Sequence, residues 1–185
     1  MTTTFEDYTQ LADRFGAVVD TLGARDWDAP SPCEGWTGRD VLDHVMSTQR
    51  DFLGRNGIDL GEARDRAGDG ADPARDWHDH DERMRALLGD SEVAEQEYDG
   101  MFGRSTIGEA ITRFYGFDLI VHRWDLARAG GRDSELSPAE LDVVDAAADG
   151  FGEHLYGEGV CRPAVAVDDG AGRQERVLAR LGRRA

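Results

Sequence analysis

Three side chains that can bind a metal or move a proton lie close together in one stretch of the sequence: Asp118, His122 and Asp125. The stretch belongs to a run from Thr106 to Ala129 whose apolar spacing predicts one long helix. With about 100° of rotation per residue, the three side chains fall within about 60° of one another, inside the arc of apolar residues. The pattern therefore places ionisable groups where the helix should face a core.

An unpaired charge in that position would cost several kcal/mol, so Asp118 and His122 need a compensating partner. The two residues are four positions apart, so they face the same neighbouring helix. A carboxylate and an imidazole from one helix, with a further ligand from another helix, can hold a divalent metal ion. A metal-free bundle, in which His122 only hydrogen-bonds Asp118 and Asp125, is the alternative that the residues leave open.

Apolar residues recur every three or four positions in several segments, which predicts amphipathic helices. The expected helices cover residues 5–22, 38–54, 73–88, 106–129 and 138–157, with a short helix at 174–181. The expected N-caps are Thr4, Thr37, Ser105 and Ser137. Segments 56–72 and 91–104 are expected to be a surface loop and a loop or short extended piece, and no run shows a convincing strand pattern.

These elements predict an all-α fold, an up-down four-helix bundle with extra short elements. The length suits a single domain over residues 1–185. We expect the main bundle at about 1–157 and a short C-terminal appendage, 158–185, packed on it.

The sequence holds other histidines, and a cysteine, whose side chains can bind metal ions. His44 lies just beyond the apolar arc of helix 38–54, so it could be a ligand or a hydrogen-bonded boundary histidine. His78 and His80 are two residues apart, which points their rings in divergent directions on a helix, and we interpret them as part of a solvated polar face. Cys33 could be a fourth ligand, a reactive thiol or a small buried filler.

The overall charge limits the partners. The chain has a net charge of −17, which argues against nucleic acid and against anionic lipid surfaces. No apolar run approaches the ~20 residues of a membrane span, and the first residues lack the pattern of a signal peptide. Two cysteines cannot form a disulfide framework. These observations predict a cytoplasmic protein with no nucleic acid or membrane partner.

Several motifs resemble one known family. In chain order they are Pro32-Cys33-x-Gly35-Trp36-Thr37, His44, and Asp118-x-x-x-His122-x-Trp124-Asp125-Leu126-Ala127. Their order and separation resemble the DinB-like metal-binding four-helix bundles, and most closely the actinobacterial branch related to the N-terminal domain of mycothiol-dependent maleylpyruvate isomerase. The Gly182-Arg183 ending is also similar to that branch.

The resemblance implies a ligand set for a divalent metal: His44, Asp118 and His122. Zinc is the first expectation, with nickel, iron or manganese as alternatives. The sequence departs from the isomerase at position 118, where an aspartate stands in place of a glutamate and shortens the ligand by one methylene. Asp125 is expected either to fix the ring of a ligand, to act as a base near the site, or to accept an N–H from a neighbouring helix.

The resemblance also implies a function. An open coordination position would take the sulfur of a low-molecular-weight thiol, as in a mycothiol-type transferase or isomerase that acts on small electrophiles. Trp36 and Trp124 are expected to pack around the site. A non-catalytic metal-binding sensor or partner module is the alternative, and a homodimer is expected by analogy with similar bundles.

Overall fold

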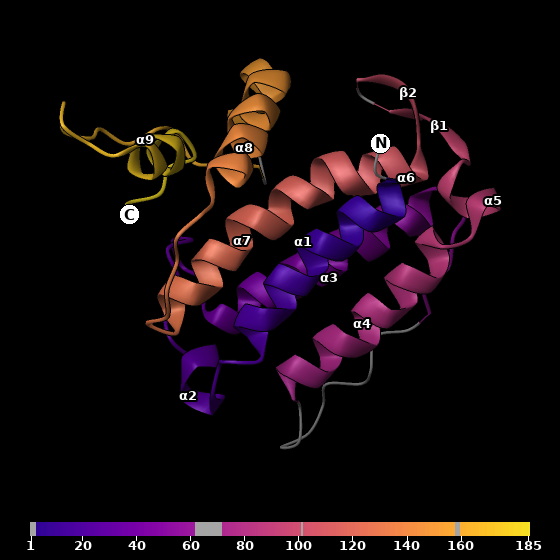
Figure 1. The fold of residues 1–185 in the computed structure, drawn as a ribbon, viewed down its shortest axis with the longest axis horizontal. Coiled ribbons are helices and arrows are strands. Elements are labelled where there is room, and N and C mark those ends of the chain that lie inside the picture. The colour runs from indigo at the N-terminus through magenta and orange to yellow at the C-terminus, as the bar shows by residue number, and fades with distance from the viewer. Residues whose placement is uncertain (1–2, 62–71, 101, 158–159) are drawn as a thin grey trace.

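The computed structural model describes residues 3–61, 72–100, 102–157 and 160–185. Within these residues, four long helices pack side by side in a bundle (Figure 1), namely α1 (Thr4–Val19), α3 (Gly38–Arg55), α4 (Pro73–Leu88) and α7 (Gly116–Ala129). α1 and α3 each pack on both α4 and α7, so they occupy opposite corners of the bundle. The predicted all-α bundle is therefore confirmed. None of the described helices is long and apolar enough to cross a membrane.

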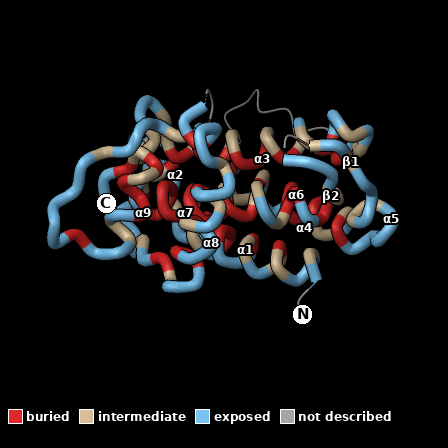
Figure 2. The backbone as a smooth tube through the Cα atoms, turned by 90° about the horizontal axis from the view of Figure 1, so that it is seen from above, coloured by how far each residue is buried: buried red, intermediate tan, exposed pale blue. Residues whose placement is uncertain are grey.

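The C-terminal part of the chain packs on the outside of this bundle. α8 (Pro138–Phe151) lies against α7 and continues as a 3-10 turn, η2 (Gly152–Tyr156), and α9 (Arg173–Arg180) packs on α8 (Figure 1). The buried side chains accordingly form two apolar clusters, one inside the bundle and one between α7, α8 and α9. Figure 2 shows that much of the chain at α7 is buried.

On α7, the apolar residues form two separate faces. Leu119 and Leu126 belong to the bundle core, and the other face packs toward α8 and α9 with Phe117, Ile120, Val121 and Trp124. At about 100° per residue, the strip that carries Asp118, His122 and Asp125 runs between the two faces. The prediction of a single apolar arc is wrong in this respect. The polar groups follow a seam between two cores, where Asp118 keeps 26% of its side chain exposed.

The predicted helix 106–129 contains a wider turn. Thr106, not Ser105, is the N-cap of the first part, and the elements in order are α6 (Ile107–Ala110), the π turn η1 (Ile111–Tyr115) and α7. The N–H of Gly116 donates to the carbonyl of Ile111, five residues earlier. Because a π turn contains an extra residue, it shifts the helical phase by about 100°. The shift lets Ile107 and Ile111 share one core with Leu119.

The ends of the other helices follow the predicted caps with two small differences. Thr37 and Ser137 cap α3 and α8, each with an acidic residue at the third helical position, as predicted. The N-cap of α1 is Thr3 instead of Thr4, because the hydroxyl of Thr3 accepts the N–H of Glu6. α1 also ends at Val19, three residues before the predicted end.

Two short helices and a β-hairpin complete the described fold: α2 (Ala24–Trp27), α5 (Ser91–Ala94), β1 (Glu97–Gly100) and β2 (Gly103–Thr106). The two strands are antiparallel, with Glu97 opposite Thr106. The expectation of a short extended piece within 91–104 is therefore confirmed, and strands of this length show little alternation of apolar and polar residues. Most of the predicted loop 56–72 lies outside the described residues.

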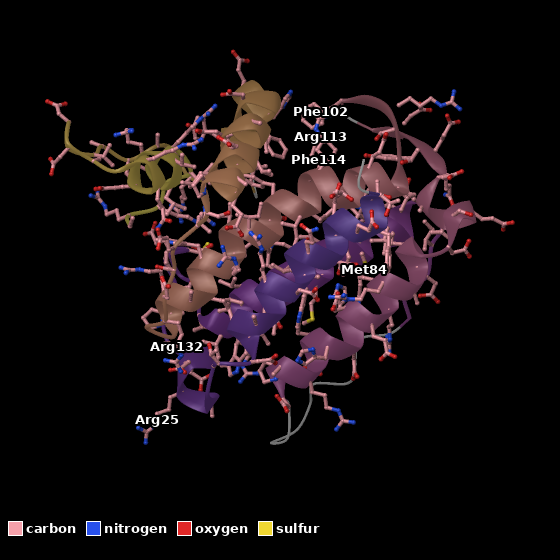
Figure 3. All side chains as sticks on the ribbon, viewed as in Figure 1. Arg25, Met84, Phe102, Arg113, Phe114 and Arg132 are labelled. Atoms are coloured by element: carbon pink, nitrogen blue, oxygen red, sulfur yellow. The ribbon has the colours of Figure 1, made fainter. Side chains whose placement is uncertain are left out.

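The turn of the hairpin reaches across to α8. Phe102 stacks on Phe114 with ring centroids 5.3 Å apart and meets Phe151 edge-on at 5.8 Å. Figure 3 shows Phe102, Arg113 and Phe114 gathered at this end of the molecule. The hairpin is thereby attached to both helical layers.

The two histidines of α4 have different environments. His78 is exposed, as predicted, and its Nε2 lies 2.7 Å from Asp20 Oδ1. His80 is only 1% exposed, so the prediction of a solvated polar face is wrong for this residue. It lies three residues after Trp77 and four before Met84, and this spacing places it on the buried face. Its Nε2 lies 2.8 Å from Gln49 Oε1 of α3.

We predict that His80 makes folding stability depend on pH. Burial, with smaller contributions from the charges of Arg50 and Arg83, lowers the pKa of His80 to about 3. The unfolded chain, with an ordinary histidine pKa, binds the proton first as the pH falls, so this contribution is complete above about pH 6.5 and is lost below it. Between pH 7 and 5 the loss should be about 2 kcal/mol.

Urea unfolding of His80→Leu and of the matched control His78→Leu at both pH values tests this prediction. The loss of unfolding free energy between pH 7 and pH 5 should be smaller than in the wild type, by about 2 kcal/mol, in His80→Leu but not in His78→Leu. This comparison does not depend on the absolute stability of either variant. Equal pH dependence in the two variants would contradict it.

Candidate metal centre

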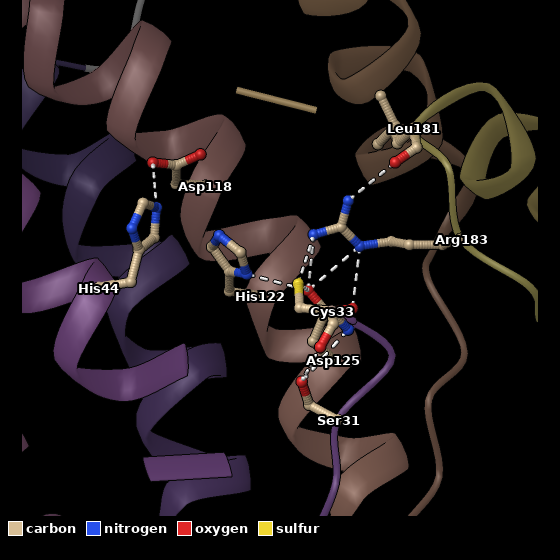
Figure 4. Close-up of polar contacts among 8 residues, drawn as sticks. All are labelled: Ser31, Cys33, His44, Asp118, His122, Asp125, Leu181 and Arg183. Carbon is tan, nitrogen blue, oxygen red and sulfur yellow. Dashed lines mark hydrogen bonds and ion pairs between the residues drawn. The ribbon is translucent and has the colours of Figure 1, made fainter. Parts of the chain in front are cut away.

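Two neighbouring helices bring the three predicted ligands together. His44 comes from α3, and Asp118 and His122 come from α7. One potential ligand atom of each residue lies within 4.8 Å of the other two, as Figure 4 illustrates. His44 Nε2 is 4.0 Å from Asp118 Oδ2. The structure thus places these side chains in a group that could hold a metal ion.

The local sequence explains the position of His44. Its neighbours Val41 and Val45 are buried in the bundle core, so the imidazole lies at the edge of that face and is 23% exposed. Trp36, from the turn before α3, covers the two histidines. Its ring centroid lies 4.9 Å from that of His44 and 6.3 Å from that of His122.

The ring of His122 is held by Asp125. His122 Nδ1 lies 2.9 Å from Asp125 Oδ2, and both side chains are buried. Since an ionised carboxylate only accepts hydrogen bonds, Nδ1 must carry the proton. The lone pair is then on Nε2, which Figure 4 shows on the side of His44 and Asp118. Histidines that bind metals are commonly oriented by such a carboxylate.

Arg183, near the C-terminus, completes the surroundings of Asp125. It is 7% exposed, and its Nε and Nη2 donate to the carboxylate at 2.9 and 2.8 Å. Burial alone would raise the pKa of Asp125. The charge of Arg183 and the hydrogen bonds from His122 and Arg183 outweigh burial and lower this pKa to about 2. Asp125 is therefore a carboxylate at neutral pH.

The turn before Arg183 depends on a glycine. Gly182 has φ +78°, and a Cβ atom there would lie 2.5 Å from Cβ of Arg162. Any larger residue would be strained and would meet this neighbour. Gly182 therefore allows the chain to turn Arg183 inward.

The electrostatic state of the ligands suits a divalent ion. Burial lowers the pKa of His44 to about 4, with smaller contributions from the neighbouring His122 and from Arg183, so its imidazole is neutral at neutral pH. Burial raises the pKa of Asp118, and the charges of His122 and Arg183 oppose that rise only in part. An ion would supply the missing positive charge.

The distances also fit an ion. Among the described residues, no side chain donates a hydrogen bond to Asp118, and 4.0 Å from His44 is too long for one. Two atoms that bind one zinc ion at a tetrahedral angle lie about 3.4 Å apart. Closing the gap between His44 and Asp118 therefore takes a shift of about 0.6 Å. The three ligand atoms all lie within 4.8 Å of one another, and two imidazoles and one carboxylate in such a group can bind a divalent metal.

A pocket of about 540 Å³ opens beside the two histidines. One wall contains Trp36, His44 and His122, and the opposite wall is built by the tail, with Cys161, Arg162, Pro163, Val165 and residues 181–183. The volume is typical of small-molecule sites. The tail therefore forms a wall of the candidate site as well as packing on the bundle.

Cys33 lines the same pocket. Its thiol donates to Asp125 Oδ2 at 3.3 Å and accepts from Arg183 Nη2 at 3.2 Å. The side chain is partly exposed, so it is not simply a buried filler. Burial and the charge of Asp125, opposed by Arg183, raise the pKa of the thiol to about 12. Cys33 is therefore a protonated thiol at neutral pH when no metal is bound.

Three residues of the site were not recognised from the sequence: Cys161, Arg162 and Arg183. The sequence offers the Gly182-Arg183 pair only as a likeness to a family. Arginine side chains are usually solvated, so nothing in the local pattern marks Arg183 as buried. The observed roles depend on where the tail packs.

Fold and site together define an α-helical bundle with a candidate divalent-metal centre that opens into a pocket. The chain belongs to the mycothiol maleylpyruvate isomerase N-terminal domain family, whose model matches residues 8–127. The matched range contains all three candidate ligands and Asp125, and it ends before α8.

Two relatives come from Mycobacterium tuberculosis, from strains CDC 1551 and H37Rv, and both bear the name uncharacterized protein. Each is 29% identical to this chain over 150 residues, which is 76% of this chain and 74% of the relative. No solved structure gives a significant match.

We predict slow alkylation of Cys33 in the metal-free folded protein. With a pKa of about 12 the thiolate is scarce, so iodoacetamide at pH 8 should modify Cys33 roughly a hundredfold or more slowly than in the urea-unfolded chain. Peptide mapping by mass spectrometry separates Cys33 from Cys161. Equal rates in the folded and unfolded protein would contradict the hydrogen-bonded, protonated state.

Proposed function

We propose that this protein binds one divalent metal ion through His44, Asp118 and His122, and that it activates a small thiol for reaction with an electrophile. The observation that carries the proposal is the convergence of these three ligands beside a pocket of about 540 Å³. Three protein ligands would leave a coordination position open, as in catalytic zinc sites.

Each residue has a defined part in this proposal. His44 offers a neutral imidazole, Asp118 supplies one negative charge, and Asp125 keeps the proton of His122 on Nδ1. Trp36 packs against both imidazole rings and limits their movement. Zinc is our first choice for this donor set, with nickel, iron or manganese as alternatives.

The chemistry needs a stronger nucleophile than a free thiol at neutral pH. A divalent ion held by these residues would favour the thiolate form of the bound cosubstrate. The pocket would place the electrophile next to it, between Trp36 and the tail residues Pro163 and Val165. Membership of a mycothiol-related family supports a mycothiol-type thiol and a transferase or isomerase reaction.

The proposed ligands predict a metal content of about one divalent ion per chain, because a single group of three donors would hold it. Elemental analysis of the untagged protein should find that ion, and His44→Ala, Asp118→Asn and His122→Ala should each lose most of it. His78→Ala is the matched control because its exposed side chain lies on α4, so it should keep the ion. A His122→Ala protein that is folded and retains stoichiometric metal would refute the ligand assignment.

The thiol reaction predicts turnover that requires both metal and thiol. Purified protein should accelerate thiol addition to small electrophiles, including unsaturated carbonyl compounds, and removal of the metal should reduce the rate at least about a hundredfold. Readdition of zinc should restore it. Stoichiometric metal without thiol-dependent turnover across a panel of thiols and electrophiles would favour a non-catalytic sensor or partner module.

A further inference from the structure

A second group of metal-binding atoms lies next to the first and shares one residue with it. Cys33, His122 and Asp125 each place a ligand atom within 4.8 Å of the other two. His122 and Asp125 are buried, and Cys33 is partly exposed to the pocket. A sulfur, a nitrogen and an oxygen donor at such distances suit thiophilic divalent ions such as zinc or cadmium.

A cation of the protein itself occupies this second group. The guanidinium of Arg183 lies 2.8 Å from Asp125 Oδ2 and 3.2 Å from the sulfur of Cys33 (Figure 4). It bonds to two of the three candidate donors, while the third, His122, also bonds to Asp125. Because a guanidinium cannot lose its proton in proteins, it is a permanent positive charge at this position.

We propose that Cys33, His122 and Asp125 form a second metal site that the guanidinium of Arg183 fills in the native protein, so that its removal admits a thiophilic divalent ion. This proposal rests on the proposed function at one point, the residue His122, which belongs to both groups of ligands. Coordination by Cys33 replaces the thiol proton, which passes to solvent, and needs no oxidant or reductant.

With the guanidinium of Arg183 in the second group, the candidate metal centre would hold a single metal ion. An ion in the second group would bind Asp125 and Nδ1 of His122 and would replace the hydrogen bond between them. That hydrogen bond holds the ring of His122 toward the first group. The guanidinium leaves that hydrogen bond in place. It also carries a single, delocalised charge, so it repels an ion in the first group less than a divalent ion would.

Cobalt and cadmium titrations test the proposal, because thiolate coordination gives each metal a ligand-to-metal charge-transfer band in the ultraviolet. The wild type should bind about one ion and show no thiolate band. Arg183→Gln keeps a hydrogen-bond donor and removes the charge, so it should bind about two ions and show the band. Adding Cys33→Ser to Arg183→Gln should remove the band and the second ion.

Matched variants separate this proposal from the first site. Arg183→Lys keeps a cation and should remain at about one ion, and Arg184→Gln changes an exposed neighbour and should behave as the wild type. His44→Ala combined with Arg183→Gln should lose the first ion but keep the thiolate band. If the proposed function fails and the second site is real, this band still appears.

Two results would overturn the proposal: a folded Arg183→Gln protein without a second ion or thiolate band, or a wild type that already shows both. Circular dichroism identifies variants that fail to fold. If Arg183→Gln is unfolded, Arg183→Met, which retains much of the apolar stem, takes its place in the titrations. The same two results would then overturn the proposal.

Discussion

The buried ion pair between Arg183 and Asp125 connects the parts of the structure on which the candidate site depends. Asp125 is 0% exposed and Arg183 is 7% exposed, so each needs the other's charge. Through Asp125 the pair holds the ring of His122, and through Cys33 it contacts the turn that leads into α3. One interaction therefore ties the C-terminal tail, the central helix and the N-terminal half of the site together.

The position of that pair follows from the double burial of α7. One face of the helix belongs to the bundle and the other to the layer of α8 and α9. Polar side chains between two such cores are stable only if they hydrogen-bond to one another or bind a ligand. Asp125 is hydrogen-bonded by His122, Arg183 and Cys33, whereas among the described residues no side chain donates a hydrogen bond to Asp118, and His44 lies 4.0 Å from it. This contrast separates the orienting carboxylate from the candidate ligand.

The pocket depends on the tail for part of its lining. The family match covers residues 8–127, which supply the three candidate ligands and Trp36 but not the opposite wall. That wall comes from residues 161–163, Val165 and residues 181–183. Under the proposed function, a substrate would contact the candidate metal ligands, which lie inside the family match, and a tail side that lies outside it. The tail side is where differences in specificity between relatives would arise.

Local patterns in the sequence predicted most of the helices and the caps Thr37 and Ser137, because periodicity and capping act over a few residues. The same patterns indicated that Asp118 and His122 share a partner. The family resemblance supplied His44. Tertiary structure alone decided that α7 is buried on two faces and that Arg183 reaches Asp125 across 58 positions of the chain. Contacts between distant segments depend on how whole helices pack, and no local spacing encodes that packing.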